Sequence, residues 1–285
     1  MKDPVISMVM PSFNQVKYIE KAIVSFLKQD YPSKELIIID GGSTDGAVDI
    51  IRKYGSKIKY WVSESDRGQS HAINKGISVA TGDLIGWLNS DDLLLPGALT
   101  RVATSWRSLQ CKSCAWLVGG CLWLSPEERI ILCCRARRFS RLKAHWNVVP
   151  VWGPSSFFSK RLVDEVGGID ERYHYMMDTE LWLRFAKEKG LKYRVVDGYC
   201  WGLRLHPDAK MSGHNFKASP LADPLHPAWR QRRVEDNLMS QRYGVQKMPA
   251  IMRATSLLST DYLRSRFDTW RYKGLELHEF LCDER

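Results

Sequence analysis

The sequence predicts an α/β fold with a mostly parallel central sheet, on three observations. Strand-like and helix-like segments alternate through the first third of the chain in the order β-α-β-α-β-α-β. Residues 36–39 form an apolar and largely β-branched run, which is typical of a strand buried on both faces. Polar residues gather directly after each predicted strand, and ligands of parallel sheets bind beyond the carboxyl ends of the strands.

Each element of this first part follows from a residue pattern. The first strand is predicted at residues 5–10, and a helix follows because apolar residues recur with helical spacing from Ile19 to Leu27. The later strands are apolar runs, and the later helices begin at glycine-containing or polar turns. These later elements are predicted at residues 36–39, 48–54, 58–62, 69–80 and 84–88.

After about residue 105 the alternation is looser. The pattern there predicts a hairpin, a short element, a helix and a strand, at residues 116–124 with 130–134, 157–158, 181–186 and 193–196. Residues 213–228 resemble a linker, and the loosely amphipathic helices beyond it either pack on the main domain or lie on a membrane. We therefore predict a main domain at 1–215, with halves 1–105 and 106–215, and a basic helical C-terminal extension at 216–285.

The composition is that of an ordinary globular protein, with 285 residues of which 44% are hydrophobic and 26% charged. No apolar run reaches the roughly 18 residues that span a bilayer, and the amino terminus has no signal-peptide pattern. Cytoplasmic residence is therefore expected, with the inner face of the cell membrane as a candidate location. The seven cysteines are expected to be buried thiols. The spacing of Cys111, Cys114 and Cys133–Cys134 suggests a zinc site as an alternative, but no histidines accompany these cysteines.

The net charge of +10 is unevenly distributed. Residues 106–146 hold eight basic and two acidic side chains, with the basic ones concentrated between Arg135 and Lys143. This cluster fits an anionic membrane surface or an acidic acceptor, and the alternative is a solvated basic face. Nucleic-acid binding is not expected, because no recognised nucleic-acid module is present.

The most informative segment is Asn89-Ser90-Asp91-Asp92, at the end of the fourth predicted strand. Its two adjacent carboxylates have no cation beside them in the sequence, and their mutual repulsion is costly away from water unless a cation binds there. Hard oxygen ligands suit Mg²⁺ or Mn²⁺, which commonly link protein carboxylates to substrate phosphates. The alternative is a solvated turn before Pro96.

Taken together, the motifs resemble the family-2 glycosyltransferases, which have the GT-A nucleotide-sugar-binding fold and act with inversion. The resemblance covers roughly residues 5–215. It is carried, in the order of that family, by Met10-Pro11-Ser12-Phe13-Asn14, Ile38-Ile39-Asp40-Gly41-Gly42-Ser43-Thr44-Asp45-Gly46, Ser65-Asp66-Arg67-Gly68, Ala72-Ile73-Asn74-Lys75-Gly76, Leu88-Asn89-Ser90-Asp91-Asp92, Gly167-Gly168-Ile169-Asp170, Met177-Asp178-Thr179-Glu180-Leu181-Trp182-Leu183-Arg184 and Arg204-Leu205-His206.

The resemblance implies a nucleotide site made of Pro11, Ser12, Asn14, Asp40, Asp66, Arg67, Asn74, Asn89 and Ser90. Asp40 would accept a hydrogen bond from the N–H of a uracil-type base. The alternative for both Asp40 and Asp45 is that they cap the helix that follows. Arg67 would contact phosphate, with a surface ion pair as the alternative. Asn74 would position either the ribose or a neighbouring loop.

For the metal, the resemblance implies Asp91, assisted by Asp92, and His206 from the far side of the site. Many relatives carry an acid where this chain has Asn89, which can hydrogen-bond but adds no charge. A lone histidine is more often structural, which is the alternative for His206.

The implied general base is Asp178, which would take the proton of the attacking hydroxyl. Met177 replaces an acid that usually precedes this position in the family, Glu180 is the second candidate base, and the alternative for Asp178 is the N-cap of the following helix.

We therefore predict a Mn²⁺- or Mg²⁺-dependent inverting glycosyltransferase. It would move a sugar from a nucleoside diphosphate donor, UDP-linked, to a sugar or lipid-linked acceptor in surface polysaccharide synthesis. One alternative is a catalytically inactive nucleotide-sugar-binding relative, suggested by Asn89 and Met177. Another is a nucleotidyltransferase, although residues 11–15 are not the glycine-rich basic loop that such an enzyme would want.

Overall fold

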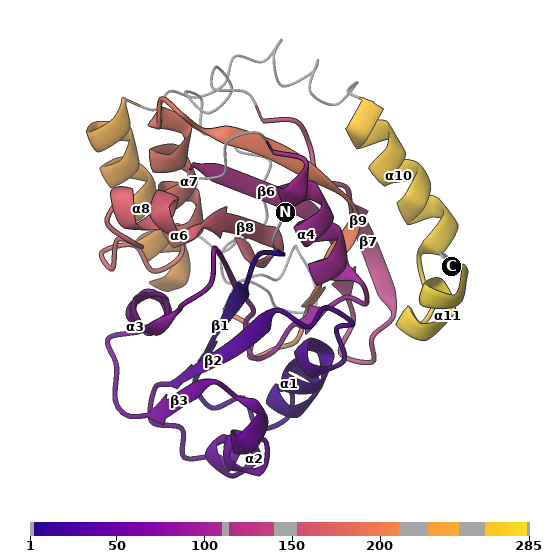
Figure 1. The fold of residues 1–285 in the computed structure, drawn as a ribbon, viewed down its shortest axis with the longest axis horizontal. Helices are drawn as coiled ribbons and strands as arrows, with labels where there is room; N and C mark the ends of the chain where they lie inside the picture. Colours follow the sequence, from indigo (N-terminus) through magenta and orange to yellow (C-terminus); the bar gives the residue numbers. More distant parts are fainter. Residues whose placement is uncertain (1–2, 110–113, 140–152, 211–226, 245–259, 284–285) are drawn as a thin grey trace.

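The computed structural model describes residues 3–109, 114–139, 153–210, 227–244 and 260–283 (Figure 1). Their strands form one sheet of nine, with the order β3-β2-β1-β4-β8-β6-β9-β5 and with β7 paired to β6. Helices cover both faces of this sheet (Figure 1). The predicted α/β class is thus confirmed.

The first half of the sheet is fully parallel. β1 (Ile6–Ser12) lies between β2 (Lys34–Asp40) and β4 (Leu84–Trp87), and β3 (Tyr60–Ser63) forms the edge. The connecting helices are α1 (Ile19–Leu27), α2 (Ala47–Lys53) with the 3₁₀ turn η1 (Gly55–Lys57), and α3 (Gln69–Val79). Every strand and helix predicted for this part is present, within a few residues of its predicted bounds.

The second half of the sheet is mixed. β8 (Ser156–Ser159) runs antiparallel to both β4 and β6 (Ala115–Leu124), whereas β9 (Lys192–Arg204) runs parallel to β6. β7 (Ile130–Cys134) completes the predicted hairpin with β6, and the two-residue β5 (Leu93–Leu94) pairs with β9. β9 is much longer than its predicted core of 193–196, because its second part continues along β6 beyond register shifts at Gly120. The remaining elements are α4 (Ala98–Arg107), η2 (Gly153–Ser155), α6 (Lys160–Glu165), α7 (Met177–Lys187), α8 (Pro227–Tyr243), α10 (Thr260–Tyr272) and α11 (Leu277–Asp283).

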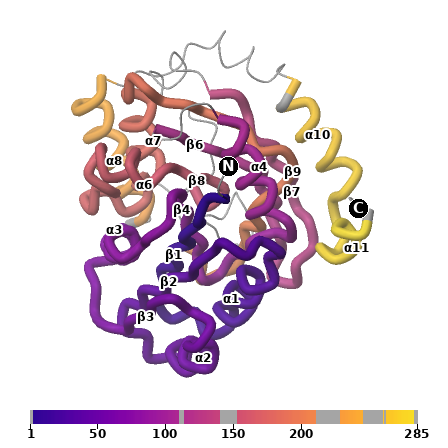
Figure 2. Tube along the Cα trace, viewed as in Figure 1, coloured from indigo at the N-terminus to yellow at the C-terminus, as the bar shows by residue number. Residues whose placement is uncertain are grey.

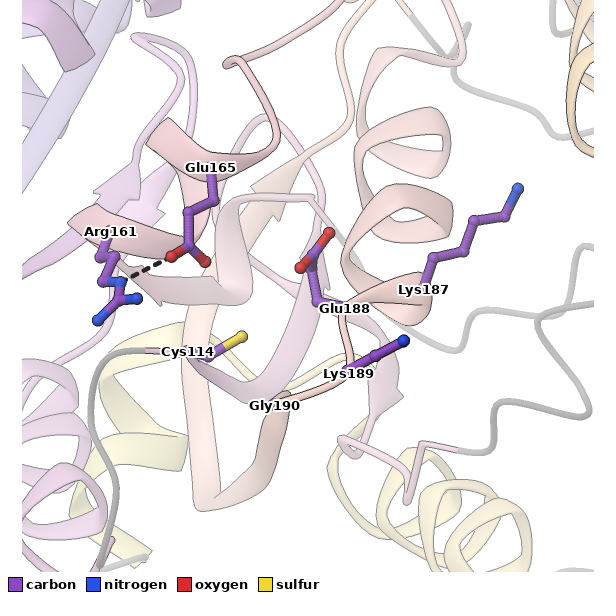
Figure 3. A pocket seen from close by; sticks show the side chains of 7 residues that line it. All are labelled: Cys114, Arg161, Glu165, Lys187, Glu188, Lys189 and Gly190. Atoms are coloured by element: carbon purple, nitrogen blue, oxygen red, sulfur yellow. Dashed lines mark hydrogen bonds and ion pairs between the residues drawn. The ribbon is translucent and has the colours of Figure 1, made fainter.

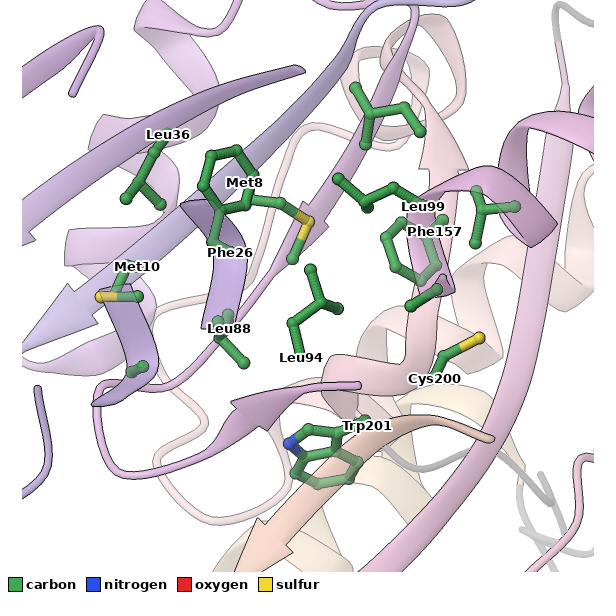
Figure 4. Close-up of a cluster of buried hydrophobic side chains, with 14 of the residues drawn as sticks. Met8, Met10, Phe26, Leu36, Leu88, Leu94, Leu99, Phe157, Cys200 and Trp201 are labelled. Carbon is green, nitrogen blue, oxygen red and sulfur yellow. The ribbon is translucent and has the colours of Figure 1, made fainter. Parts of the chain in front are cut away.

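Alternate residues of each strand feed two separate cores. On one face Met8 and Met10 of β1 pack with Phe26 of α1 and Leu99 of α4 (Figure 4). On the other face Val9 belongs to a cluster with α3 and α7, in which the Trp182 ring stacks between those of Trp87 and Trp116 at centroid distances of 5.6 and 5.0 Å. At Gly76 of α3 a Cβ atom would lie 2.3 Å from the nearest Val9 methyl, so only glycine lets this helix approach β1 so closely.

The C-terminal helices pack on the rest of the chain. α8 lies beside α7, where the Tyr243 hydroxyl donates to Glu180, and α10 lies along β7 (Figures 1 and 2). The free cysteines of β6, β7 and β9 are buried except Cys134, which is half-buried. Among the residues that the structure describes, no helix combines the length and apolar character needed to cross a membrane. Residues 213–226 of the predicted linker and residues 140–143 of the basic cluster lie outside the described residues, whereas the last two residues of that linker, 227 and 228, already belong to α8.

Candidate functional site

The loops after β1 and β2 are tied together at the carboxyl edge of the sheet. Asn14 adopts a left-handed backbone conformation (φ 52°), which asparagine tolerates better than most residues. Its side-chain oxygen accepts the N–H of Thr44 at 2.9 Å, and Asp45 accepts those of Val16 at 2.8 Å and Ala47 at 3.0 Å. Asn14 and Asp45 therefore fix the two loops by accepting hydrogen bonds from their backbone N–H groups. Pro11 and Ser12 lie in the buried end of β1, where the Ser12 hydroxyl has no partner among the described residues.

The structure does not support the expected hydrogen bond between Asp40 and a base. The Asp40 side chain is buried and already accepts four hydrogen bonds, from the N–H groups of Gly42 and Ser43 and from the hydroxyls of Ser43 and Ser63. Three of these bonds go to Oδ2 and one to Oδ1, and no part of the residue is exposed to an incoming ligand. Asp40 instead holds the glycine turn in shape.

A different pair of side chains faces the ligand side of this turn. A Cβ atom at Gly41 would lie 2.9 Å from Oδ2 of Asp66 and 3.3 Å from the Phe13 ring. Asp66 accepts the N–H of Gly68 at 2.7 Å through its other oxygen, and the Phe13 side chain is 60% exposed. The exposed ring can stack on a nucleotide base, and the carboxylate beside it can accept a hydrogen bond from an N–H group of that base. Phe13 was not predicted, although an aromatic residue among the polar residues of a strand end was a visible signal.

Two other predicted nucleotide residues are occupied elsewhere. Arg67 forms an exposed ion pair with Glu171 at 2.7 Å, which is the alternative role and not the phosphate contact. Asn74 donates to the carbonyl of Ile169 and accepts its N–H, both at 2.8 Å. These bonds fasten the loop after α6 to α3, so Asn74 positions a neighbouring loop and does not reach a ribose.

The two carboxylates after β4 point to different places. Asp92 is buried, and its oxygens accept the N–H of Arg204 at 3.0 Å and the side-chain amide of Asn89 at 2.9 Å. Burial and the neighbouring Asp91 raise the pKa of Asp92 well above its usual value. Asp92 thus joins the strand end to β9, and its predicted part in metal binding is not supported. Ser90, which precedes both carboxylates in the chain, is buried as well.

Asp91 meets the predicted histidine. Its Oδ2 lies 3.1 Å from Nε2 of His206, whose ring is buried and packs against the Tyr18 ring, tilted by 39° with the centroids 4.3 Å apart. Two neighbouring ligands of an octahedral ion with bonds near 2.1 Å are about 3 Å apart, so this pair fits Mg²⁺ or Mn²⁺. No group of three potential ligand side chains occurs within the described ranges, and the other positions of such an ion would fall to waters or phosphate oxygens.

Asp178 stands in the first turn of α7, and it does not cap the helix. The N-cap residue is Met176, while Oδ1 of Asp178 accepts the adjacent N–H of Thr179 at 2.6 Å. Oδ2 faces Gly153, where a Cβ atom would lie 3.2 Å from it and 3.1 Å from the Trp87 ring. Burial raises the pKa of Asp178, and the nearby ammonium of Lys210 partly opposes this effect. A carboxylate with an elevated pKa, whose described hydrogen bonds go to Oδ1 and not to Oδ2, suits a general base.

A hydrogen-bonded chain links the surroundings of Asp178 to the Asp91 turn. The Lys210 ammonium donates to Oε1 of Gln69 at 2.9 Å, the Gln69 amide donates to Asn89 at 2.8 Å, and Asn89 donates to Asp92. Burial lowers the pKa of Lys210 to about 8, although Asp178 nearby favours its charged form. Neither Gln69 nor Lys210 was predicted; the position of Lys210, four residues after His206, was the only signal in the sequence.

Glu180 is not available as a base. It is fully buried, binds Arg184 through two parallel contacts of 2.9 and 2.6 Å, and accepts from the Tyr243 hydroxyl. Its predicted second-choice role is therefore not supported. Trp182 is buried in the core, and the half-buried Arg184 holds Glu180 in place.

The loop before Asp178 is held by a residue from α8. Glu235 is fully buried, and its carboxylate accepts the consecutive backbone N–H groups of His174, Tyr175 and Met176, each at 2.9 Å. No sequence pattern pointed to this contact. It makes α8 part of the framework that places Asp178.

A hollow of about 470 Å³ lies at the opposite end of α7 (Figure 3). It is lined by Cys114, Arg161, Glu165 and residues 187–190. None of the predicted site residues contributes to it, so we place no function there.

The comparisons with known proteins identify glycosyltransferases as relatives of this chain. A family model described as glycosyl transferase family 2 matches residues 7–117. An uncharacterised glycosyltransferase of Mycobacterium tuberculosis is 33% identical over 189 residues, which cover 64% of this chain and 69% of the relative. One of Rickettsia typhi is 28% identical over 65% of this chain, and the chain spans about three fifths (59%) of its length.

Solved structures with a similar fold have low sequence identity. The mannosyltransferase PcManGT of Pyrobaculum calidifontis, in complex with GDP-Man and Mn²⁺, has a TM-score of 0.58 and 19% identity, and the match covers 100% of this chain and 80% of that one. TarS 1-349 of S. aureus, in complex with UDP, has a TM-score of 0.53 and 19% identity, with coverage of 71% and 61%. These likenesses concern the fold.

Proposed function

The chain belongs to glycosyl transferase family 2, and from this premise we propose that it is an inverting, metal-dependent glycosyltransferase with a UDP-linked donor. The oxygen of an acceptor hydroxyl would form a bond to the anomeric carbon while the bond from that carbon to the diphosphate breaks. The hydroxyl proton would pass to Asp178. The observation that carries this proposal is the hydrogen-bonded chain from Lys210 to Asn89, which joins the surroundings of the base to the Asp91 turn.

Asp178 has the features that the proton transfer needs. Its Oδ2 faces Gly153, a residue with no side chain to obstruct an incoming hydroxyl, and burial brings its pKa closer to neutral. A base whose pKa approaches the working pH is more effective than an ordinary surface carboxylate.

The leaving diphosphate would be stabilised from two sides. Asp91 and His206 would hold Mn²⁺ or Mg²⁺, which when bound supplies positive charge to the departing phosphate oxygens. The Lys210 ammonium, whose described hydrogen bond goes to a neutral amide, would supply a second charge. Asn89 would then hold Gln69 in place and would not bind the metal, which accounts for an amide where relatives have an acid.

The donor base would lie on the Gly41 turn. Phe13 would stack it, and Asp66 would accept its N–H in place of Asp40. A uracil presents one such N–H, and the structure of TarS with UDP supports a uridine nucleotide for a protein of this fold.

For the acceptor we propose a sugar or a lipid-linked saccharide in surface polysaccharide synthesis, used at the cytoplasmic face of the membrane. Residues 153–157, of which Gly153 adjoins Asp178, would line the acceptor side.

The test is a thermal-shift titration of the full chain with UDP, GDP and their sugars in the presence of Mn²⁺, followed by measurement of donor hydrolysis. We expect UDP to bind at least about tenfold more tightly than GDP, and Asp66→Asn to remove most of this preference. Asp49→Asn, an exposed aspartate paired with Arg52 on α2, is the matched control. Equal binding of UDP by both variants would contradict the assignment of Asp66, and no nucleotide binding by the unaltered chain would contradict the proposed donor.

A further inference from the structure

Helix α10 is fixed to the sheet by one face only. The N–H groups of Cys133 and Arg135 on β7 and just beyond it donate to the hydroxyls of Thr269 and Ser265, each at 3.0 Å. Asp268 is buried, binds the Arg135 guanidinium at 2.6 Å and accepts from the Tyr199 hydroxyl. These contacts set which face of α10 points outward.

The outward face carries a stripe of large apolar side chains. Leu263, Phe267 and Trp270 have the spacing i, i+4 and i+7 that aligns side chains along one face of a helix. Their exposed fractions are 52%, 57% and 79%, and the Phe267 and Trp270 rings lie 5.8 Å apart. Single exposed apolar residues are ordinary, but an aligned aromatic stripe marks a binding surface.

Basic residues flank this stripe on both sides. With about 100° per residue, Arg264 and Arg271 fall on one side of it, whereas Arg266 and Lys273 fall on the other. All four are exposed. The acidic side chain described in the span 262–274 is Asp268, which faces the sheet, so the outer surface of α10 is uniformly cationic around its apolar centre.

We propose that the outer face of α10 docks on a membrane that contains anionic lipid. A helix with aromatic and aliphatic residues in the centre and arginine or lysine at the sides lies in the interface, where the rings enter the acyl boundary and the cations meet phosphate headgroups. A second copy of the chain related by a twofold axis would bring these cationic flanks against each other, which disfavours self-association. This proposal is independent of the transfer chemistry, although docking would bring the site near a lipid-linked acceptor.

The test is co-sedimentation of the full chain with vesicles of phosphatidylcholine, with and without phosphatidylglycerol. We expect binding only to the anionic vesicles, with strong weakening at high salt. The double variant Phe267→Ser/Trp270→Ser and the double variant Arg264→Glu/Arg266→Glu should each lower the partition coefficient about tenfold or more. The matched control is Val234→Ser/Leu238→Ser, which removes two exposed apolar residues from α8 and should bind as the unaltered chain does.

Two readouts separate the possible results. Failure of the unaltered chain to bind anionic vesicles, or equal binding by the α10 and α8 variants, would overturn the proposal. A dimer in light scattering that dissociates in Phe267→Ser/Trp270→Ser would also overturn it, because a second copy would then cover the stripe. Donor hydrolysis in solution should be unchanged in the α10 variants, so loss of vesicle binding and loss of the proposed activity are distinguishable.

Discussion

The Nε2 atom of His206 lies 3.1 Å from Oδ2 of Asp91, although 115 residues separate the two in the chain. Asp91 follows β4 and His206 follows β9, and the two segments are held together by the pairing of β5 with β9 and by the hydrogen bond from the Arg204 N–H to Asp92. The buried Asp92 therefore helps to position Asp91 and His206 without contacting the metal site that we propose for them. This division of work between adjacent carboxylates leads to a prediction for each.

Substitution of either member of the pair should weaken metal binding. Asp91→Asn and His206→Ala each remove one of the two protein ligands, so we expect the apparent affinity for Mn²⁺ to fall about a hundredfold or more. Mn²⁺ titration followed by electron paramagnetic resonance measures this directly. His278→Ala removes an exposed histidine from α11 and should have no effect. Full donor hydrolysis in excess chelator would contradict the metal role.

Asp92→Asn should act on folding more than on the metal. The carboxylate accepts bonds at both oxygens, and an amide presents only one acceptor, so either the Arg204 N–H or the Asn89 amide loses its partner. We expect a loss of about 1–3 kcal/mol in the free energy of unfolding. Urea unfolding measures this loss of free energy. An unchanged unfolding midpoint together with a large loss of Mn²⁺ affinity would show that Asp92 is a metal ligand.

Asp178→Asn should abolish transfer while leaving the donor bound. Loss of a general base typically costs 10²–10⁴-fold, roughly, in the rate of the chemical step, and the side chain contacts no part of the Gly41 turn. Single-turnover rates and UDP titrations by calorimetry separate the two effects. If UDP affinity fell together with the rate, Asp178 would be a structural residue of the donor site.

The charge of Lys210 should set the pH dependence of the base. Asp178 acts only when ionised, so the rate falls as the pH drops through its raised pKa. The Lys210 ammonium favours the ionised form of Asp178, and Lys210→Met should therefore move this acid limb to higher pH. Lys53→Met, which removes a cation paired with Glu20 far from the site, is the control. If the acid limb of the pH–rate profile were unshifted in Lys210→Met, the charge of Lys210 would have no influence on the ionisation of Asp178.

Lys210→Met should also change stability, with a definite sign. The pKa of Lys210 is about 8 in the folded chain, below the ordinary value near 10.4, so the unfolded chain binds the extra proton between these values. Stability should thus rise as the pH increases from about 8 to 10, and below pH 8 the cost of the buried charge remains in full. The variant removes this cost and should melt at a higher temperature than the unaltered chain at pH 7.

The fold was largely predictable because its first half depends on local patterns. The apolar run at 36–39 and the helical spacing from Ile19 to Leu27 predicted β2 and α1 well. β9 was predicted too short, because its second part is held by pairing with β6 and by no pattern of its own. Pairing between strands that are far apart in the chain cannot be predicted from the local sequence pattern of either strand.

The site was predictable to the level of residues but not of contacts. Asp91 and His206 were both named from the sequence and lie in contact, while the roles of these two residues and of Asp178 stay predictions. Asp40 has the right type and place for base binding, but it is buried, and the hydroxyl of Ser63 from another strand donates to it. Lys210 escaped prediction because a lysine acquires its lowered pKa only from burial.

Glu235 gives the last prediction, because it links a helix far along the chain to the base. Its carboxylate accepts three consecutive N–H groups at residues 174–176, just ahead of Asp178. Glu235→Gln replaces one acceptor oxygen by an amide that points its own hydrogens at these donors. We expect the free energy of unfolding to fall by about 2–4 kcal/mol. The rate of transfer should fall with it, because the first turn of α7 is no longer held.

The two effects are separated by working well below the unfolding temperature, where the variant is still folded. There kcat should be reduced while UDP affinity stays unchanged, since the side chains nearest Gly41 are Asp66 and Phe13 and neither comes from α8. The neighbouring Asp236→Asn, whose side chain accepts none of these N–H groups, should keep the normal rate. A Glu235→Gln variant that is less stable but has a normal kcat would show that α8 supports the fold without positioning Asp178.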